Sequence, residues 1–197
     1  MYDTTITFIL ICTSFNKVII YKYTYFQVAA PDTACFFNCQ MGKGRTTTGM
    51  VIGCLLKRIL HNIGVEETSH VANTDDHSFA VINKLLEIVP TAVDAKKLLD
   101  SIIDLCGEPP VGTGLQNLRI CIMWTKEKYD QEPDHKKPFW KHMGVNFIER
   151  YFYLVCYATY VIEEAPNSLS KTFVEWMDTH SELRQVIKSG METFEWN

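Results

Sequence analysis

The segment "NCQMGKGRTTTGM", which runs from Asn38 to Met50, constrains the fold more than any other part of the chain. A short apolar run, "ACFF", lies just before it, and an apolar stretch with helical spacing, "VIGCLLKRIL", follows it. These two patterns are typical of a buried β-strand and a helix packed on a core. The sequence therefore predicts strand, loop and helix in this order, with a cysteine, two glycines, a lysine and an arginine gathered in the loop.

This loop has the residue types of an anion-binding loop. Five residues separate Cys39 from Arg45, and a loop of this length can direct successive backbone N–H groups at a phosphate held at the positive end of the following helix. Glycines permit the backbone angles and the close approach that such a loop needs, and the planar guanidinium of Arg45 can bind two phosphate oxygens. We therefore predict a phosphate cradle formed by Gln40, Met41, Gly42, Lys43, Gly44 and Arg45.

The same positive field would favour a thiolate at Cys39, and the thiolate is the reactive form of cysteine. Thr46 places a hydroxyl beside the arginine, where it can donate to the sulfur and help it leave when a phospho-cysteine is hydrolysed. We accordingly predict Cys39 as a nucleophile, Arg45 as a phosphate clamp and Thr46 as a hydroxyl helper. The neighbouring Cys35 and Cys54 are most simply small core residues.

Two other interpretations explain the loop less well. A nucleotide-binding P-loop needs Ser or Thr after its lysine and an earlier glycine, but Gly44 follows Lys43 and Phe37 occupies the place of that glycine. A structural turn around a buried cysteine accounts for the glycines, but not for Lys43 or Arg45. Lys43 keeps two readings: a second cation that favours a ligand with several phosphates, or a solvated side chain that points away.

Composition sets limits on the whole chain. With 197 residues, 47% of them hydrophobic, and a net charge of -4, we expect one hydrophobic core and no nucleic acid as a partner. The seven cysteines are odd in number, widely spread and mostly set in apolar runs, as in a reduced, cytoplasmic protein. Their spacing completes no zinc site, so we expect neither a metal nor another cofactor. The apolar run Phe8 to Cys12 is far shorter than the ~20 residues of a transmembrane helix.

The remaining pattern is mostly helical. Residues 1–30 hold two β-prone segments, at 5–12 and 18–26, and "TACFF" predicts a further strand. Aromatic clusters such as "NFIERYFYLVCYATYV" repeat on predicted helices and are interpreted as core. We predict helices over residues 47–62, 75–90, 93–107, 115–130, 137–164, 168–178 and 181–188.

The string "CQMGKGRTTTG" matches the Cys-x5-Arg-Ser/Thr signature of the protein tyrosine phosphatase superfamily, and it resembles most the paladin family of phosphatase-like proteins. The segments "INKLLEIVPTAVDAKKLLDSIIDLC", "LQNLR" and "GVNFIERYFYLVCYATYV" are similar to the helical region of paladin repeats. The resemblance begins near residue 31, which separates a phosphatase-like domain, 31–197, from a β-prone segment, 1–30. It implies an α/β, protein tyrosine phosphatase-like fold with a mostly α-helical carboxy-terminal part, and the few strand candidates indicate an incomplete central sheet and a partial repeat.

Two departures from the superfamily bear on catalysis. Asn38 stands directly before the cysteine, where histidine is usual. Asp3 and Asp32 are the only acidic residues that precede Cys39. Neither fits the upstream loop that supplies a general acid in this superfamily, so no general acid is assigned. Two functions stay open: a cysteine-dependent phosphatase acting on phosphorylated protein, phosphotyrosine in particular, or on an inositol phosphate or phosphoinositide, and a weak or inactive phosphate-binding pseudophosphatase.

Overall fold

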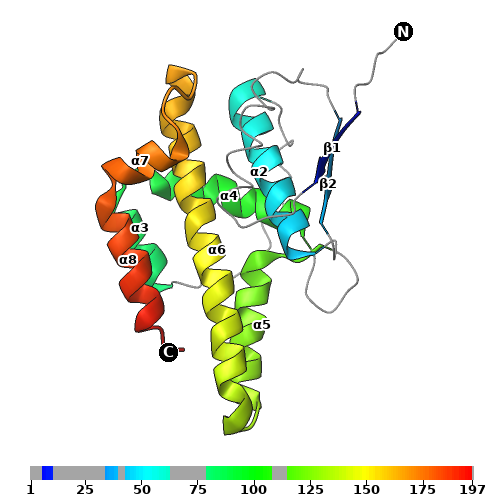
Figure 1. Cartoon of the computed structure of the whole chain (residues 1–197), viewed down its shortest axis with the longest axis vertical. Coiled ribbons are helices and arrows are strands. Elements are labelled where there is room, and N and C mark those ends of the chain that lie inside the picture. Colours follow the sequence, from blue (N-terminus) through cyan, green and yellow to red (C-terminus); the bar gives the residue numbers. More distant parts are fainter. Residues whose placement is uncertain (1–5, 11–33, 40–42, 63–78, 108–114, 197) are drawn as a thin grey trace.

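The computed structural model describes residues 6–10, 34–39, 43–62, 79–107 and 115–196. Two short strands lie at one side of the molecule, next to helix α2 (Figure 1). The long helix α6 runs through the middle, and α3, α7 and α8 cover its opposite side (Figure 1). Cys39 and Lys43, the described residues on either side of residues 40–42, therefore lie where the strands meet the helical body.

Strands β1 (Ile6–Leu10) and β2 (Ala34–Asn38) pair in parallel, from Ile6 opposite Ala34 to Leu10 opposite Asn38. They confirm the strands predicted over 5–12 and at "TACFF". The predicted strand over 18–26 lies outside the described residues. The described part of the sheet thus consists of two strands, and the fold class is confirmed as far as strand β2 followed by a helix and a mostly helical carboxy-terminal part.

Helices make up most of the described chain, and each corresponds to a predicted one. Residues 75–78 of the predicted second helix lie outside the described part, and helix α2 begins three residues before its predicted start at Thr47. The helices are α2 (Gly44–His61), α3 (Ala80–Ile88), α4 (Ala92–Cys106), α5 (Leu118–Gln131), α6 (Lys137–Glu164), α7 (Phe173–Thr179) and α8 (Ser181–Glu192), with 3-10 turns at Asp134–Lys136 and Ala165–Asn167.

Helix boundaries follow from local chemistry. Pro138 stands in the first turn of α6, where its missing N–H costs nothing, and Pro166 follows the end of this helix. The predicted start of α7 at residue 168 was wrong, because Ser168 and Leu169 have φ angles of 53° and 52°, which are not helical. Helix α7 begins instead after Thr172, whose side chain forms a capping box with Glu175.

Helix α6 is the centre of the core. It packs against α2, α4, α5, α7 and α8, and every residue from Leu154 to Val161 is buried. Tyr157 and Tyr160 meet Phe173 at ring-centroid distances of 5.4 and 5.5 Å, and Phe173 stacks on Trp176 at 6.1 Å. The interpretation of the aromatic clusters as core is therefore confirmed.

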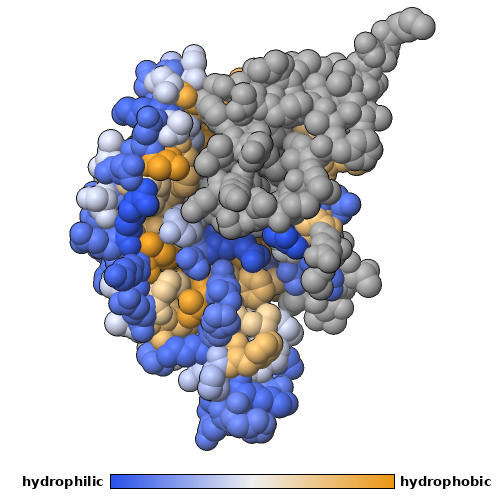
Figure 2. All heavy atoms as spheres, viewed as in Figure 1, coloured by the Kyte–Doolittle hydropathy of each residue, from blue (hydrophilic) through white to orange (hydrophobic). Residues whose placement is uncertain are grey.

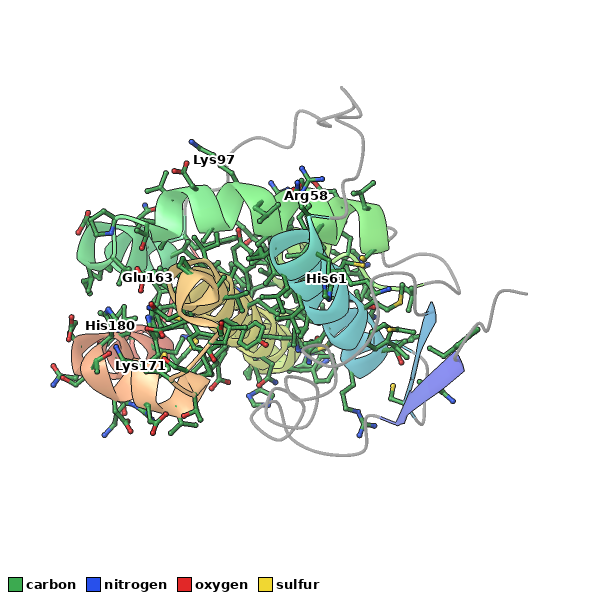
Figure 3. All side chains as sticks on the ribbon, turned by 90° about the horizontal axis from the view of Figure 1, so that it is seen from above. Arg58, His61, Lys97, Glu163, Lys171 and His180 are labelled. Carbon is green, nitrogen blue, oxygen red and sulfur yellow. The ribbon has the colours of Figure 1, made fainter. Side chains whose placement is uncertain are left out.

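A polar link joins the ends of three helices beside this aromatic core. Glu163, labelled on α6 in Figure 3, accepts a hydrogen bond from Trp176 Nε1 in α7 at 2.7 Å. It also accepts one from the hydroxyl of Thr91, directly before α4. The carboxylate of Glu163 thereby provides a hydrogen-bond acceptor for the indole N–H of Trp176, which would otherwise be buried without a partner.

The visible surface of the described part is largely hydrophilic, with small apolar areas between the helices (Figure 2). Within the described ranges, no helix combines the length and the apolar character that crossing a membrane requires.

Candidate functional site

The structure brings Cys39 and Thr46 together. Cys39 directly follows strand β2 and is only 5% exposed, and Thr46 lies in the first turn of α2 and is equally buried. The hydroxyl Oγ1 of Thr46 donates a hydrogen bond to Sγ of Cys39 over 3.1 Å. The cysteine and the hydroxyl that the sequence singled out are thus neighbours at the amino-terminal end of a helix.

The first turn of α2 has features that favour an anion. Lys43 is the N-cap residue and makes no side-chain cap, and the first turn carries no acidic residue. The hydroxyls of Thr47 and Thr48 donate to the carbonyl oxygens of Lys43 and Gly44, at 3.3 and 2.9 Å, so within the described ranges these hydroxyls do not cap the amide groups of the turn. Uncapped N–H groups and the helix dipole favour negative charge at this end.

The remaining residues of the predicted cradle are placed only in part. Arg45 is exposed, and Lys43 and Gly44 are half-buried. Gln40, Met41 and Gly42 lie outside the described residues, as do Asp3 and Asp32. The path of the loop around a phosphate therefore stays a prediction.

A loop from elsewhere in the sequence lies against this turn. The backbone N–H of Gln116, between α4 and α5, donates to Oγ1 of Thr47 at 3.1 Å. A Cβ added to Gly44 would lie 3.6 Å from Oε1 of Gln116. In the sequence, "LQNLR" is marked only by its resemblance to paladin repeats, and no local pattern connects it with Cys39.

Asn117 holds this loop in place. Its Oδ1 caps α5 by accepting hydrogen bonds from the backbone N–H groups of Arg119 and Ile120, at 3.0 and 3.2 Å. Its Nδ2 donates to Asp104 of α4 at 2.9 Å, and Arg119 forms an ion pair with the same carboxylate at 2.8 Å. The loop that carries Gln116 is thereby tied to both α4 and α5.

Arg150 of α6 is a second residue that sequence reasoning missed. A Cβ on Gly44 would lie 2.9 Å from its Nη1, so the guanidinium lies against the first residue of α2. It is half-buried, and its guanidinium carbon is 5.7 Å from the ring centroid of Phe147. Burial lowers the pKa of Arg150, and within the described ranges its guanidinium makes no hydrogen bond or ion pair. A poorly compensated cation therefore adds to the positive end of α2.

Comparisons with known protein sequences identify relatives of this chain. The family model of protein tyrosine phosphatase-like phytases, described as "Inositol hexakisphosphate", matches residues 12–57, which include β2 and most of α2. Paladin from Homo sapiens is 30% identical over 166 residues, and paladin from Danio rerio is 27% identical over 165. Both alignments cover 78% of this chain. The chain belongs to the paladin family.

The chain spans 18% of the length of these paladins, as it does of paladin from Gallus gallus, which is 29% identical over 164 residues. The phytase-family match begins at residue 12, ahead of residue 31, where the paladin resemblance was placed from the sequence. The division of the chain at residue 30 stays a prediction. No solved structure matches the chain.

A small cavity borders the first turn of α2, which follows the candidate site. It lies between α2 and α6, with the loop after α4 at its edge, and Gly44, Thr47, Gln116 and Arg150 supply its polar lining. Thr48 and Cys121 also line the cavity, and apolar side chains form the rest of its wall: Val51, Ile103, Leu118, Phe147 and Leu154. The cavity thus places polar groups from three separate segments of the chain beside the turn that follows Cys39.

Proposed function

We propose that this paladin-family chain binds phosphate monoesters at the loop from Cys39 to Arg45, within a protein tyrosine phosphatase-like α/β fold, and hydrolyses them through a phospho-cysteine. The observation that carries the proposal is the 3.1 Å hydrogen bond from Thr46 Oγ1 to Cys39 Sγ at the start of α2. A structural cysteine needs no hydroxyl donor, whereas a thiolate that must attack and then leave does.

In the proposed reaction, the sulfur of Cys39 attacks phosphorus, an S–P bond forms and the ester P–O bond breaks. Water then attacks phosphorus, the S–P bond breaks and the Thr46 hydroxyl stabilises the departing thiolate. Arg45 and the amide groups of the loop hold the non-bridging oxygens in both steps. Since no general acid is assigned, esters with good leaving groups are the expected substrates.

The charges around the loop favour a ligand with several phosphates, such as an inositol phosphate or a phosphoinositide head group, over phosphotyrosine. Lys43 lies directly at the N-cap of α2, and Arg150 approaches Gly44 from α6. Each adds a positive charge beyond that of Arg45, which a single phosphate does not need. The inositol hexakisphosphate description of the matched family points to the same class of substrate.

A second candidate function is a phosphate-binding pseudophosphatase. Asn38 is exposed and uncharged where a histidine would support the thiolate. This change removes an aid to turnover and leaves the anion-binding groups in place. Catalysis and binding are therefore separable properties of the site.

The experiment measures both properties on the same variants. Binding of vanadate and inositol hexakisphosphate is followed by calorimetry, and turnover with an activated aryl phosphate. We expect Arg45→Ala to abolish binding and Cys39→Ser to keep most of it while ending turnover. Arg58→Ala is the matched control, because Arg58 lies in the last turn of the same helix, near His61 (Figure 3), and should leave both properties unchanged.

The outcomes distinguish the candidates. Turnover that Cys39→Ser abolishes supports the phosphatase, and binding without turnover supports the pseudophosphatase. If Arg45→Ala weakens binding no more than Arg58→Ala does, the loop is not the phosphate site and both functions fail.

A further inference from the structure

Two cysteines outside the candidate site form a close pair. Cys54 lies on α2, eight residues after Thr46 and thus about 12 Å farther along the helix. Cys106 is the last residue of α4, which packs against α2 (Figure 1). Their sulfur atoms are 3.8 Å apart, with Cys54 exposed and Cys106 half-buried, so a small oxidant in solvent can reach the pair.

The two thiols are chemically unequal. The S–H of Cys106 donates to Sγ of Cys54. This bond, opposed by burial and aided by the nearby charge of Lys57, lowers the pKa of Cys54 to about 7. The same bond, together with burial, raises the pKa of Cys106. At neutral pH one sulfur is therefore a nucleophilic thiolate, and its neighbour is a protonated thiol held next to it.

The other described cysteines are less exposed than Cys54, and Cys35 is half-buried. Cys39 is only 5% exposed. Cys121 and Cys156 are fully buried, and burial raises the pKa of both, that of Cys121 to about 11. Oxidation by a solvent peroxide should consequently begin at Cys54, and not at Cys39, which the sequence predicts as the nucleophile.

We propose that Cys54 and Cys106 form a reversible disulfide that joins α2 to α4 when the protein meets a hydroperoxide. The Cys54 thiolate attacks one oxygen of hydrogen peroxide, the O–O bond breaks and a sulfenic acid forms, while the departing hydroxide takes a proton from solvent and becomes water. The Cys106 sulfur then attacks the Cys54 sulfur, the S–S bond forms, and the sulfenic oxygen leaves as a second water with the Cys106 proton. The sulfurs must approach from 3.8 Å to the bond length of about 2.0 Å.

The disulfide would lie next to the loop with Gln116 and Asn117, which contacts the first turn of α2. Gly107 follows Cys106, and a Cβ on Gly107 would lie 2.5 Å from the backbone N of Asn117, so the chain packs closely there. The neighbouring Gln116 in turn donates to Thr47 of α2. The disulfide would thus connect covalently two elements that meet at the candidate site, although its formation does not depend on any phosphate chemistry there.

The test treats the full chain with less than one equivalent of hydrogen peroxide, alkylates the remaining thiols and maps the peptides by mass spectrometry. We expect a cross-linked pair of peptides containing Cys54 and Cys106, two hydrogen masses lighter than the reduced pair, which dithiothreitol separates again. Cys39 should be recovered in its alkylated form, which shows that the peroxide has not oxidised it. Oxidation of Cys39 or Cys121 ahead of the pair would overturn the proposal.

A variant tests the roles of the two sulfurs. In Cys106→Ala, we expect the Cys54 sulfenic acid to persist, where dimedone can trap it, and the midpoint of Cys54 alkylation to move from pH about 7 toward about 8.5. Alanine is preferred to serine, because a serine hydroxyl would also donate to the thiolate. Cys35→Ala is the control, since Cys35 is half-buried in β2 and its loss should leave both disulfide and midpoint intact. An unchanged midpoint in Cys106→Ala contradicts the assignment of Cys106 as the donor.

Discussion

Replacing Asn117 by alanine should destabilise the fold by about 1.5 to 2.5 kcal/mol. The side chain is 2% exposed and makes three hydrogen bonds, two as the cap of α5 and one to Asp104. Loss of an N-cap costs about 1 kcal/mol. The lost bond to Asp104, and the two amide groups left without a partner in a half-buried place, add about 0.5 to 1.5 kcal/mol. Asp104 keeps its ion pair with Arg119, which limits the total.

The assay is urea unfolding followed by tryptophan fluorescence, with Thr172→Ala as the matched control. Thr172 also caps a helix, accepting from the backbone N–H of Glu175 at 3.2 Å, but it is exposed and lies on the other side of α6. Its loss should cost about 1 kcal/mol. In addition, Asn117→Ala should weaken vanadate binding, because the neighbouring Gln116 contacts the first turn of α2, whereas Thr172→Ala should leave binding unchanged.

A third variant separates capping from the bond to Asp104. Asn117→Asp keeps the oxygen that caps α5. It replaces Nδ2, which donates to Asp104 over 2.9 Å, by a carboxylate oxygen, so two carboxylates face each other. We expect a loss of stability at neutral pH that shrinks as the pH falls toward 4, since protonation of either carboxylate relieves the repulsion. If Asn117→Ala costs no more than Thr172→Ala, or if Asn117→Asp shows no such dependence on pH, the described hydrogen bonds do not hold the loop.

Three further experiments test the packing, two by substitution and one by alkylation. Gly144→Ala should cost about 1 to 3 kcal/mol and displace Trp196, because the new Cβ would lie 2.1 Å from the indole; an unchanged fluorescence spectrum would contradict this. Leu85→Ala, at a fully buried position, should lower the free energy of unfolding by about 2 to 5 kcal/mol, whereas Leu105→Ala, at a side chain 54% exposed, should change it by less than about 0.5. Cys121 should resist iodoacetamide from pH 6 to about 9 until urea unfolds the chain, since it is fully buried and its pKa is raised to about 11.

Much of the local structure could be predicted from the sequence, because its causes are local. Helix α6 runs from Lys137 to Glu164 as expected, since prolines flank an uninterrupted helical pattern. The cysteine and threonine of the candidate site meet because strand, short loop and helix leave their side chains little choice of position. The error at the start of α7 is also local in origin, since two left-handed residues, Ser168 and Leu169, are not marked by glycine.

The partners of the candidate site could not be found in this way. Arg150, Gln116 and the Cys54–Cys106 pair are set by how α4, α5 and α6 pack on α2, and their sequence separations give no pattern to read. Periodicity in a helix identifies the face that is buried, but not the helix against which it packs. The sequence by itself therefore determined most of the helices and predicted the loop and its chemistry. The tertiary structure decided which distant charges and thiols become neighbours, because only the packed core brings them within a few ångströms.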